Sequence, residues 1–160
     1  MIERTVAALL ALLISAATGV TGWAPAPTTA WDRAAGVLCD FPVHVEPTVD
    51  RVRVKKLGAD RELYTGALVM QVTNTDTGAT TSVDAGGTSL IAYRPGGTVD
   101  RDSTWYAAGP AMFGFRAGLG NRPRGLYVFT GLYTVDFAAD GYKTVTVYAG
   151  GEREICGLLG

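Results

Sequence analysis

His44 is the only histidine of the chain and the first residue to consider for acid–base chemistry. A catalytic histidine needs a nucleophile within hydrogen-bonding distance and a carboxylate that orients its ring. Ser82, Ser89 and Ser103 are candidate nucleophiles, but none lies in the Gly-x-Ser-x-Gly pattern of a nucleophile elbow. We therefore expect His44 to face solvent or to bind the backbone from a strand, and we predict no catalytic residue.

Asp100 and Asp102 are the best candidates for a pair of acidic catalytic groups. Side chains two residues apart share a face of a strand, and paired carboxylates carry out glycoside hydrolysis. Arg101 lies between them beside a turn, which is more typical of a solvated hairpin. A cofactor-free enzyme is therefore our least favoured hypothesis. The other aspartates we considered lack the spacing of a calcium-binding loop, so we predict no metal site and no cofactor. They are Asp76, Asp84, Asp136 and Asp140.

The densest run of charge covers residues 51–56, where four of six residues are basic. Such a run could bind an acidic polymer, or it could protect an edge strand from pairing with another chain. Asp50 and Asp60 flank it, and the whole chain has a net charge of -1. We favour the edge strand and expect no nucleic-acid partner.

Aromatic residues share one face of the segment 126–137, because every second residue of a strand points to the same side. Packing in the core explains them, and a pocket for a small apolar molecule is the alternative. The side chains that we predict to bind such a ligand are Trp105, Met112, Phe113, Tyr127 and Phe129.

The residues after position 38 show the pattern of consecutive antiparallel strands. Runs of β-branched and aromatic residues alternate with Gly or Asp-Gly breaks, and no stretch has a helical period. A break is expected at Gly86-Gly87. The segment 108–124 is expected to be a distorted strand or a long loop. The pattern predicts an all-β fold, an antiparallel meander of seven or eight strands. We expect a closed or nearly closed barrel, with a two-sheet sandwich as the alternative.

The N-terminal segment 1–30 has the pattern of a secretory signal peptide. Residues 6–20 are uncharged, and as a helix they would rise about 22 Å, less than the roughly 30 Å of a hydrocarbon core. Small residues follow, so cleavage after Ala30 or after Gly22 is expected. We predict a signal peptide over 1–30, a linker over 31–38 and one β domain over 39–160. Localisation outside the cell, with no stable membrane insertion after cleavage, follows from this prediction.

Cys39 and Cys156 are the only cysteines, and they lie near the two ends of the predicted domain. In an exported chain, two cysteines without Cys-x-x-Cys spacing indicate one disulfide. Their Cα atoms must then lie within about 6 Å of each other. The first and last parts of the domain are therefore expected to be neighbours.

The predicted domain contains three short motifs. They are Cys39-Asp40-Phe41-Pro42-Val43, residues 126–131 with their final Thr-Gly, and residues 154–159 with an acidic residue, Cys and two leucines. These motifs resemble the Cys-x-Phe-Pro-Val start, a strand that ends in Thr-Gly and the ending of a family of small secreted actinobacterial proteins of unknown function. The resemblance implies an exported β domain whose ends are joined by a disulfide, and it transfers no catalytic residue.

The sequence favours a non-catalytic binding domain over an enzyme. The expected partner is a small apolar ligand or a component of the cell envelope. The alternative is a structural or interaction protein of the envelope with a filled core.

Overall fold

The computed structural model describes residues 22–160, which form strands and one short 3-10 helix. Among these residues no helix is long and apolar enough to cross a membrane. Most of the expected signal peptide, residues 1–21, lies outside the described residues. The elements are β1 Ala24–Pro25, β2 Trp31–Arg33, β3 Val43–Asp50, β4 Arg53–Lys56, β5 Arg61–Thr65, β6 Leu68–Asn74, β7 Thr80–Asp84, β8 Thr88–Thr98, β9 Arg101–Ala108, β10 Ala111–Phe115, β11 Gly125–Phe137, β12 Lys143–Glu154 and η1 Cys156–Leu158.

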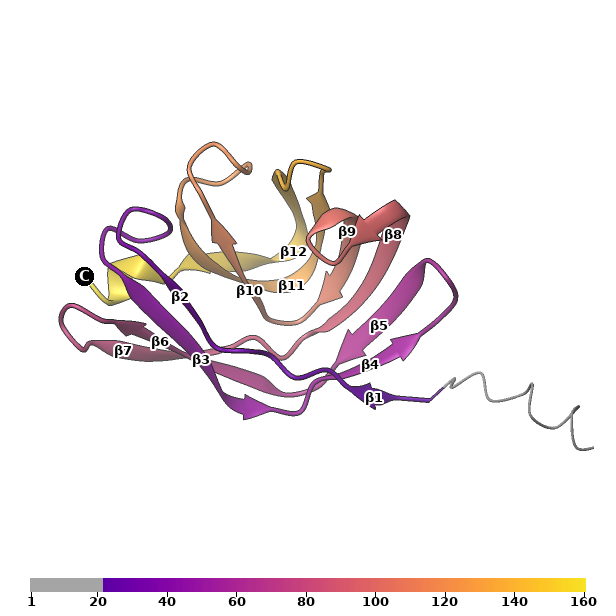
Figure 1. Cartoon of the computed structure of the whole chain (residues 1–160), viewed down its shortest axis with the longest axis horizontal. Helices are drawn as coiled ribbons and strands as arrows, with labels where there is room; N and C mark the ends of the chain where they lie inside the picture. The colour runs from indigo at the N-terminus through magenta and orange to yellow at the C-terminus, as the bar shows by residue number, and fades with distance from the viewer. Residues whose placement is uncertain (1–21) are drawn as a thin grey trace, which may run out of the picture.

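The strands form two antiparallel sheets (Figure 1). The larger sheet has the order β1-β4-β5-β8-β9-β11, and the smaller sheet has the order β2-β3-β6-β7. β9 and β10 pair with successive halves of the long β11, while β12 pairs along its other side. β10 therefore continues β9 after a break at Gly109-Pro110.

Long chain segments pass from one sheet into the other. β3 leads into β4, β5 into β6 and β7 into β8, each across a bend of two or three residues, so the order of these strands is the same in both sheets. Gly66 lies at one bend with a φ of +143°, and a Cβ atom there would lie 2.2 Å from the carbonyl oxygen of Arg51. The strands can bend together there only because this residue is glycine. The break expected at Gly86-Gly87 is the bend between β7 and β8.

The prediction of an all-β antiparallel fold is confirmed, but the prediction of a closed barrel is wrong. In residues 22–160 no strand pairs the β1 end of the larger sheet with β12, and the sandwich alternative fits the two sheets. The physical reason is the set of bends. They turn the long strands into a second layer, whereas a barrel requires one sheet that keeps curving until its two edges meet. The same bends divide long segments into more strands than the seven or eight expected.

Strands also occur in regions expected to have none. β2 lies in the expected linker and pairs with β3, and β1 lies in the expected signal peptide and pairs with β4. Cleavage after Gly22 would keep β1, whereas cleavage after Ala30 would remove it. The segment 108–124 contains both β10 and a loop, so both interpretations of it apply to part of its length.

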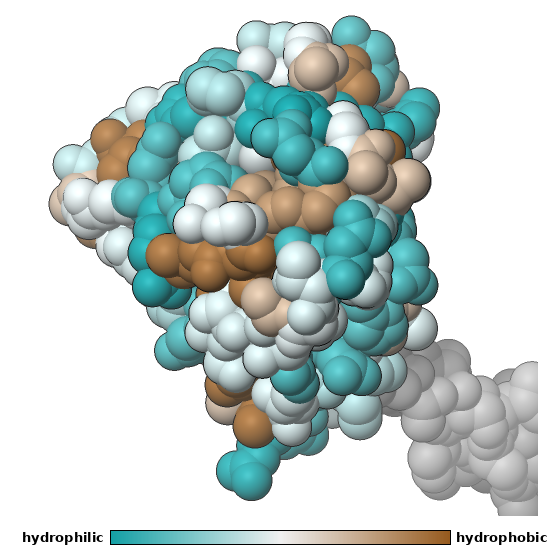
Figure 2. Space-filling view, turned by 90° about the vertical axis from the view of Figure 1, so that its left-hand side faces the viewer, coloured by the Kyte–Doolittle hydropathy of each residue, from teal (hydrophilic) through white to brown (hydrophobic). Residues whose placement is uncertain are grey.

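Two hydrophobic cores lie on the two faces of β11. Leu126 and Val128 belong to the first core, which packs against the smaller sheet, and Tyr127 and Phe129 belong to the second. Strand alternation explains this division. In Figure 2 the end of the sandwich that carries β7 and the C-terminus faces the viewer, and apolar residues form a band across it between polar ones.

The predicted disulfide between Cys39 and Cys156 is confirmed. The two Cα atoms are 5.4 Å apart, although 117 positions separate the residues in the sequence. Cys39 is buried in the first core, and Cys156 packs against this core. The bond therefore fixes the start of the domain against its end.

Replacing Tyr133 by phenylalanine is expected to stabilise the protein by about 1 kcal/mol, because a buried hydroxyl without a partner costs about 1–3 kcal/mol. The Tyr133 side chain lies in the second core with only 2% of its surface exposed, and within residues 22–160 its hydroxyl has no hydrogen-bond partner. Burial raises its pKa to about 12. Urea denaturation measures the change. Tyr106→Phe, at an exposed position on β9, should leave stability unchanged, and a less stable Tyr133→Phe variant would contradict the expectation.

Candidate functional site

An apolar cavity of about 390 Å³ lies where the strands bend between the two sheets. We call it the corner cavity. One wall comes from the bends themselves, including Val52, Gly66, Ala85 and Gly87, and from residues 26–28. The fold thus creates the cavity at the same residues that turn the sheets into a sandwich.

The second wall is the inner face of the larger sheet. Tyr64 pairs with Ser89 across β5 and β8, and Ile91 pairs with Trp105 across β8 and β9. Residues directly opposite each other in a ladder point to the same face. Ser89 and Ile91 are two residues apart on β8 and therefore also share a face. The four side chains thus line one continuous surface of the cavity.

The tip of the β8–β9 hairpin closes one side of the corner cavity. Val99 lines the cavity, and two side chains of β9 hold its backbone in place. The Val99 carbonyl oxygen accepts hydrogen bonds from Trp105 Nε1 at 2.7 Å and from Ser103 Oγ at 3.1 Å. Trp105 therefore both lines the cavity and anchors the residue that covers it.

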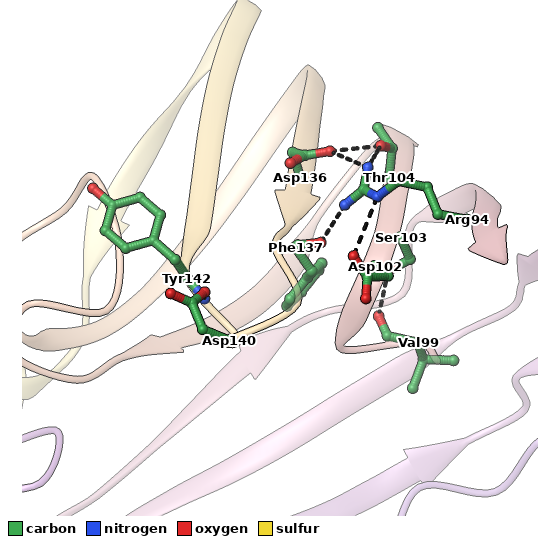
Figure 3. Close-up of polar contacts among 9 residues, drawn as sticks. All are labelled: Arg94, Val99, Asp102, Ser103, Thr104, Asp136, Phe137, Asp140 and Tyr142. Atoms are coloured by element: carbon green, nitrogen blue, oxygen red, sulfur yellow. Dashed lines mark hydrogen bonds and ion pairs between the residues drawn. The ribbon is translucent and has the colours of Figure 1, made fainter. Parts of the chain in front are cut away.

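Arg94 fixes the same hairpin from the other side (Figure 3). Its guanidinium lies 3.0 Å from Asp136 and 3.5 Å from Asp102, and it donates to the carbonyl oxygen of Phe137. Burial opposes the ionisation of Asp136, but hydrogen bonds from Thr104 and Arg94, with the charge of Arg94, hold the pKa of Asp136 below its usual value. This network joins the hairpin to β11.

Polar groups are few at the corner cavity, and they are concentrated on its sheet wall. The hydroxyls of Tyr64 and Tyr93 both donate to the same oxygen of Glu62, at 2.9 and 2.7 Å. Burial, followed by the hydrogen bond to Glu62, raises the pKa of each tyrosine. Ser89 is buried and lines the cavity. The cavity therefore offers a ligand a mainly apolar surface with three hydroxyl groups, those of Thr28, Tyr64 and Ser89.

The five residues predicted to bind an apolar ligand lie in different places. Trp105 lines the corner cavity. Phe113 packs edge-on against Trp105, with ring centroids 5.4 Å apart, and belongs to the second core with Tyr127 and Phe129. Met112 packs against the first core. Ligand binding by these residues stays a prediction, and of the five only Trp105 lines the cavity, with Phe113 packed against it.

The candidate acid–base residues do not form a shared site in the described part of the chain. His44 Nδ1 lies 2.8 Å from Asp32, and this hydrogen bond, with the charges of Asp32 and Glu46, raises the pKa of His44. None of its side-chain partners is a serine. Asp100 accepts a hydrogen bond from Thr98, whereas Asp102 lies beside Arg94. Within residues 22–160, no three His, Cys, Asp or Glu side chains are placed to hold a metal ion.

The alternation pattern missed most of the lining of the corner cavity. Val52, Tyr64 and Ile91 look like ordinary core residues in the sequence, and their convergence depends on where the strands bend. The glycines at 66 and 86–87 were the available signal, because a glycine inside a strand often marks a bend or a close backbone approach.

Neither a family model nor a curated protein nor a solved structure matches the chain. A proposal about function therefore depends on the geometry of the cavities.

Proposed function

We propose that the protein is a secreted, non-catalytic domain that binds a small apolar molecule in the corner cavity. The single observation that carries this proposal is a cavity of about 390 Å³ lined mainly by apolar side chains. Sites for small ligands are typically concave, mainly apolar and about 300–1,000 Å³ in volume, with a few polar groups that orient the ligand. The corner cavity is at the lower end of this range.

The form of the cavity favours a compact and largely uncharged ligand. Trp105 provides a large aromatic surface, and Ser89 provides a buried hydroxyl that a ligand could engage. No Asp, Glu, Lys or Arg side chain lines the cavity in the part of the chain that the structure describes. A charged group would lose its hydration there without an opposite charge to compensate for it.

Export is part of the same proposal. A disulfide is compatible with an oxidising compartment outside the cytosol. The likeness to small secreted actinobacterial proteins supports the same hypothesis. A component of the cell envelope remains the alternative partner, and a structural role with no bound ligand is the outcome if the cavity stays empty.

Titration with N-phenyl-1-naphthylamine, a neutral apolar fluorophore, tests the proposal. We expect saturable binding of one probe for each protein chain. Ala111 lines the cavity, so Ala111→Leu should fill part of it and weaken probe binding at least tenfold, since tenfold corresponds to about 1.4 kcal/mol. The added side chain would occupy space that the probe needs.

Ala149→Leu is the matched control, because Ala149 is exposed on β12 and does not line the cavity. It should bind the probe as the parent protein does, and thermal unfolding should show that both variants are folded. Absence of saturable binding, or equal binding by the two variants, would reject the corner cavity as the ligand site.

A further inference from the structure

A second cavity of about 300 Å³ differs from the corner cavity in its charge. Its lining includes four basic side chains from four separate segments: β2, the start of β9, the residue after β10 and the start of β12. We call it the basic pocket, and these residues are Arg33, Arg101, Arg116 and Lys143. Two carboxylates, Asp100 and Asp140, also line it.

The positive charges of the basic pocket are not neutralised within residues 22–160, where none of the four basic side chains forms an ion pair. Arg33 donates to the backbone carbonyl of Asp32 and lies over the ring of Trp31. Asp100 accepts from the Thr98 hydroxyl, and Asp140 accepts from the backbone of Tyr142. Four cationic groups and two carboxylates leave the pocket with a charge of +2.

The charge of Lys143 is partly removed from solvent. Its ammonium group lies 5.2 Å from the ring centroid of Phe115, is half-buried, and donates to the backbone carbonyl of Gly114. Burial lowers the pKa of Lys143, the charge of Arg116 lowers it further, and Asp100 only partly opposes this effect. Partial burial of a cation without a paired anion costs free energy, so this arrangement favours an anion that enters from outside.

We propose that the basic pocket binds a phosphomonoester group of a small organic molecule. A phosphomonoester carries about -1.5 to -2 charges at pH 7, which matches the +2 charge of the pocket. Guanidinium groups bind phosphate oxygens in a bidentate manner, and an ammonium group adds a compact charge. A single carboxylate or a phosphodiester would neutralise only half of the pocket.

The basic pocket is separate from the proposed apolar site, although the same hairpin borders both. Val99 lines the corner cavity, whereas the next two residues, Asp100 and Arg101, line the basic pocket. Binding of a phosphomonoester therefore does not depend on binding of an apolar molecule. Either site can be tested with the other left unchanged.

Isothermal titration of the full chain with glycerol 3-phosphate tests the proposal, with glycerol and the monoanionic diester glycerophosphoglycerol as comparison ligands. We expect saturable binding of the monoester, at least tenfold weaker binding of the diester and none of glycerol. Arg116→Gln should weaken monoester binding at least tenfold. Arg116 is exposed, so its replacement should not disturb folding.

Arg153→Gln is the matched control, because it removes the same charge from an exposed position on β12 that does not line the pocket. It should bind the monoester as the parent protein does. Equal losses in the two variants would show attraction by overall charge only, and equal affinity for monoester and diester would overturn the charge match. No saturable binding at millimolar concentration would overturn the site itself, whatever the apolar probe does.

Discussion

Replacing both cysteines by alanine is expected to lower the free energy of unfolding by about 4–5 kcal/mol, which is the chain-entropy value for a loop of this length. The bond joins residues 117 positions apart, so the unfolded chain gains much freedom when it is removed. Alanine is preferable to serine, because Cys39 is buried in the first core and a hydroxyl there would need a partner. Urea denaturation of the oxidised parent protein and of the double variant Cys39→Ala/Cys156→Ala measures the difference.

Reduction of the parent protein provides the control for this prediction. A thiol reductant should bring the parent protein close to the stability of the double variant, and it should leave the double variant unchanged. Without the bond, the C-terminal segment is also held less firmly against the first core, since Ile155 and Leu159 lie near Cys156 and pack in that core. A loss below about 1 kcal/mol would mean that native contacts already fix the two ends, against the chain-entropy account.

The strand content was predictable because it depends on the alternation of side-chain types between neighbouring positions of the sequence. In the segment 126–129 successive residues enter different cores, and in the rest of β11 the odd-numbered Tyr133, Val135 and Phe137 enter the second core, as the alternation of the aromatic residues indicates. The disulfide was predictable for a different reason, since two cysteines allow only one intramolecular pairing. Both inferences need only the chain itself and no knowledge of how distant strands meet.

The choice between barrel and sandwich was not predictable, because it depends on how each long strand bends. The sequence shows glycines at 66 and 86–87, but it does not show whether a glycine ends a strand or bends one that continues in another sheet. The bend at Gly66 is decided by a close approach to the backbone of Arg51, which lies in a different segment. A long-range contact of this kind has no local signal.

The basic pocket was hidden for the same reason. Arg33, Arg101, Arg116 and Lys143 are scattered along the chain, and no two of them form a motif. The densest basic run of the sequence is at 51–56, and part of it forms β4, which pairs with the edge strand β1. Local charge density predicted an edge strand, but β4 is second from the edge because β1 pairs with it, and the folded chain collects unpaired positive charge in the basic pocket.

Replacing Gly150 by alanine is expected to destabilise the protein by about 3 kcal/mol or more, since backbone strain at such a position alone costs about 1–3 kcal/mol. Gly150 faces Gly131 in the β11–β12 ladder and has a φ of +116°. A Cβ atom at position 150 would lie 2.0 Å from the carbonyl oxygen of Thr130, which belongs to the backbone and cannot rotate away. The two strands must separate locally, and the second core packs on them. Urea denaturation measures the loss.

The neighbouring Gly151 provides the control, because its replacement should change the free energy of unfolding in the opposite direction. A Cβ atom there meets nothing within 4 Å, and its φ is not in the left-handed region. Gly151→Ala should therefore stabilise the protein by about 0.5 kcal/mol, because alanine restricts the unfolded chain more than glycine does. If Gly150→Ala and Gly151→Ala gave equal stabilities, the close approach of β11 and β12 at Gly131 and Gly150 would not exist in solution. If Gly150→Ala destabilises the protein and Gly151→Ala stabilises it, the close contact between the two strands lies at a single residue pair.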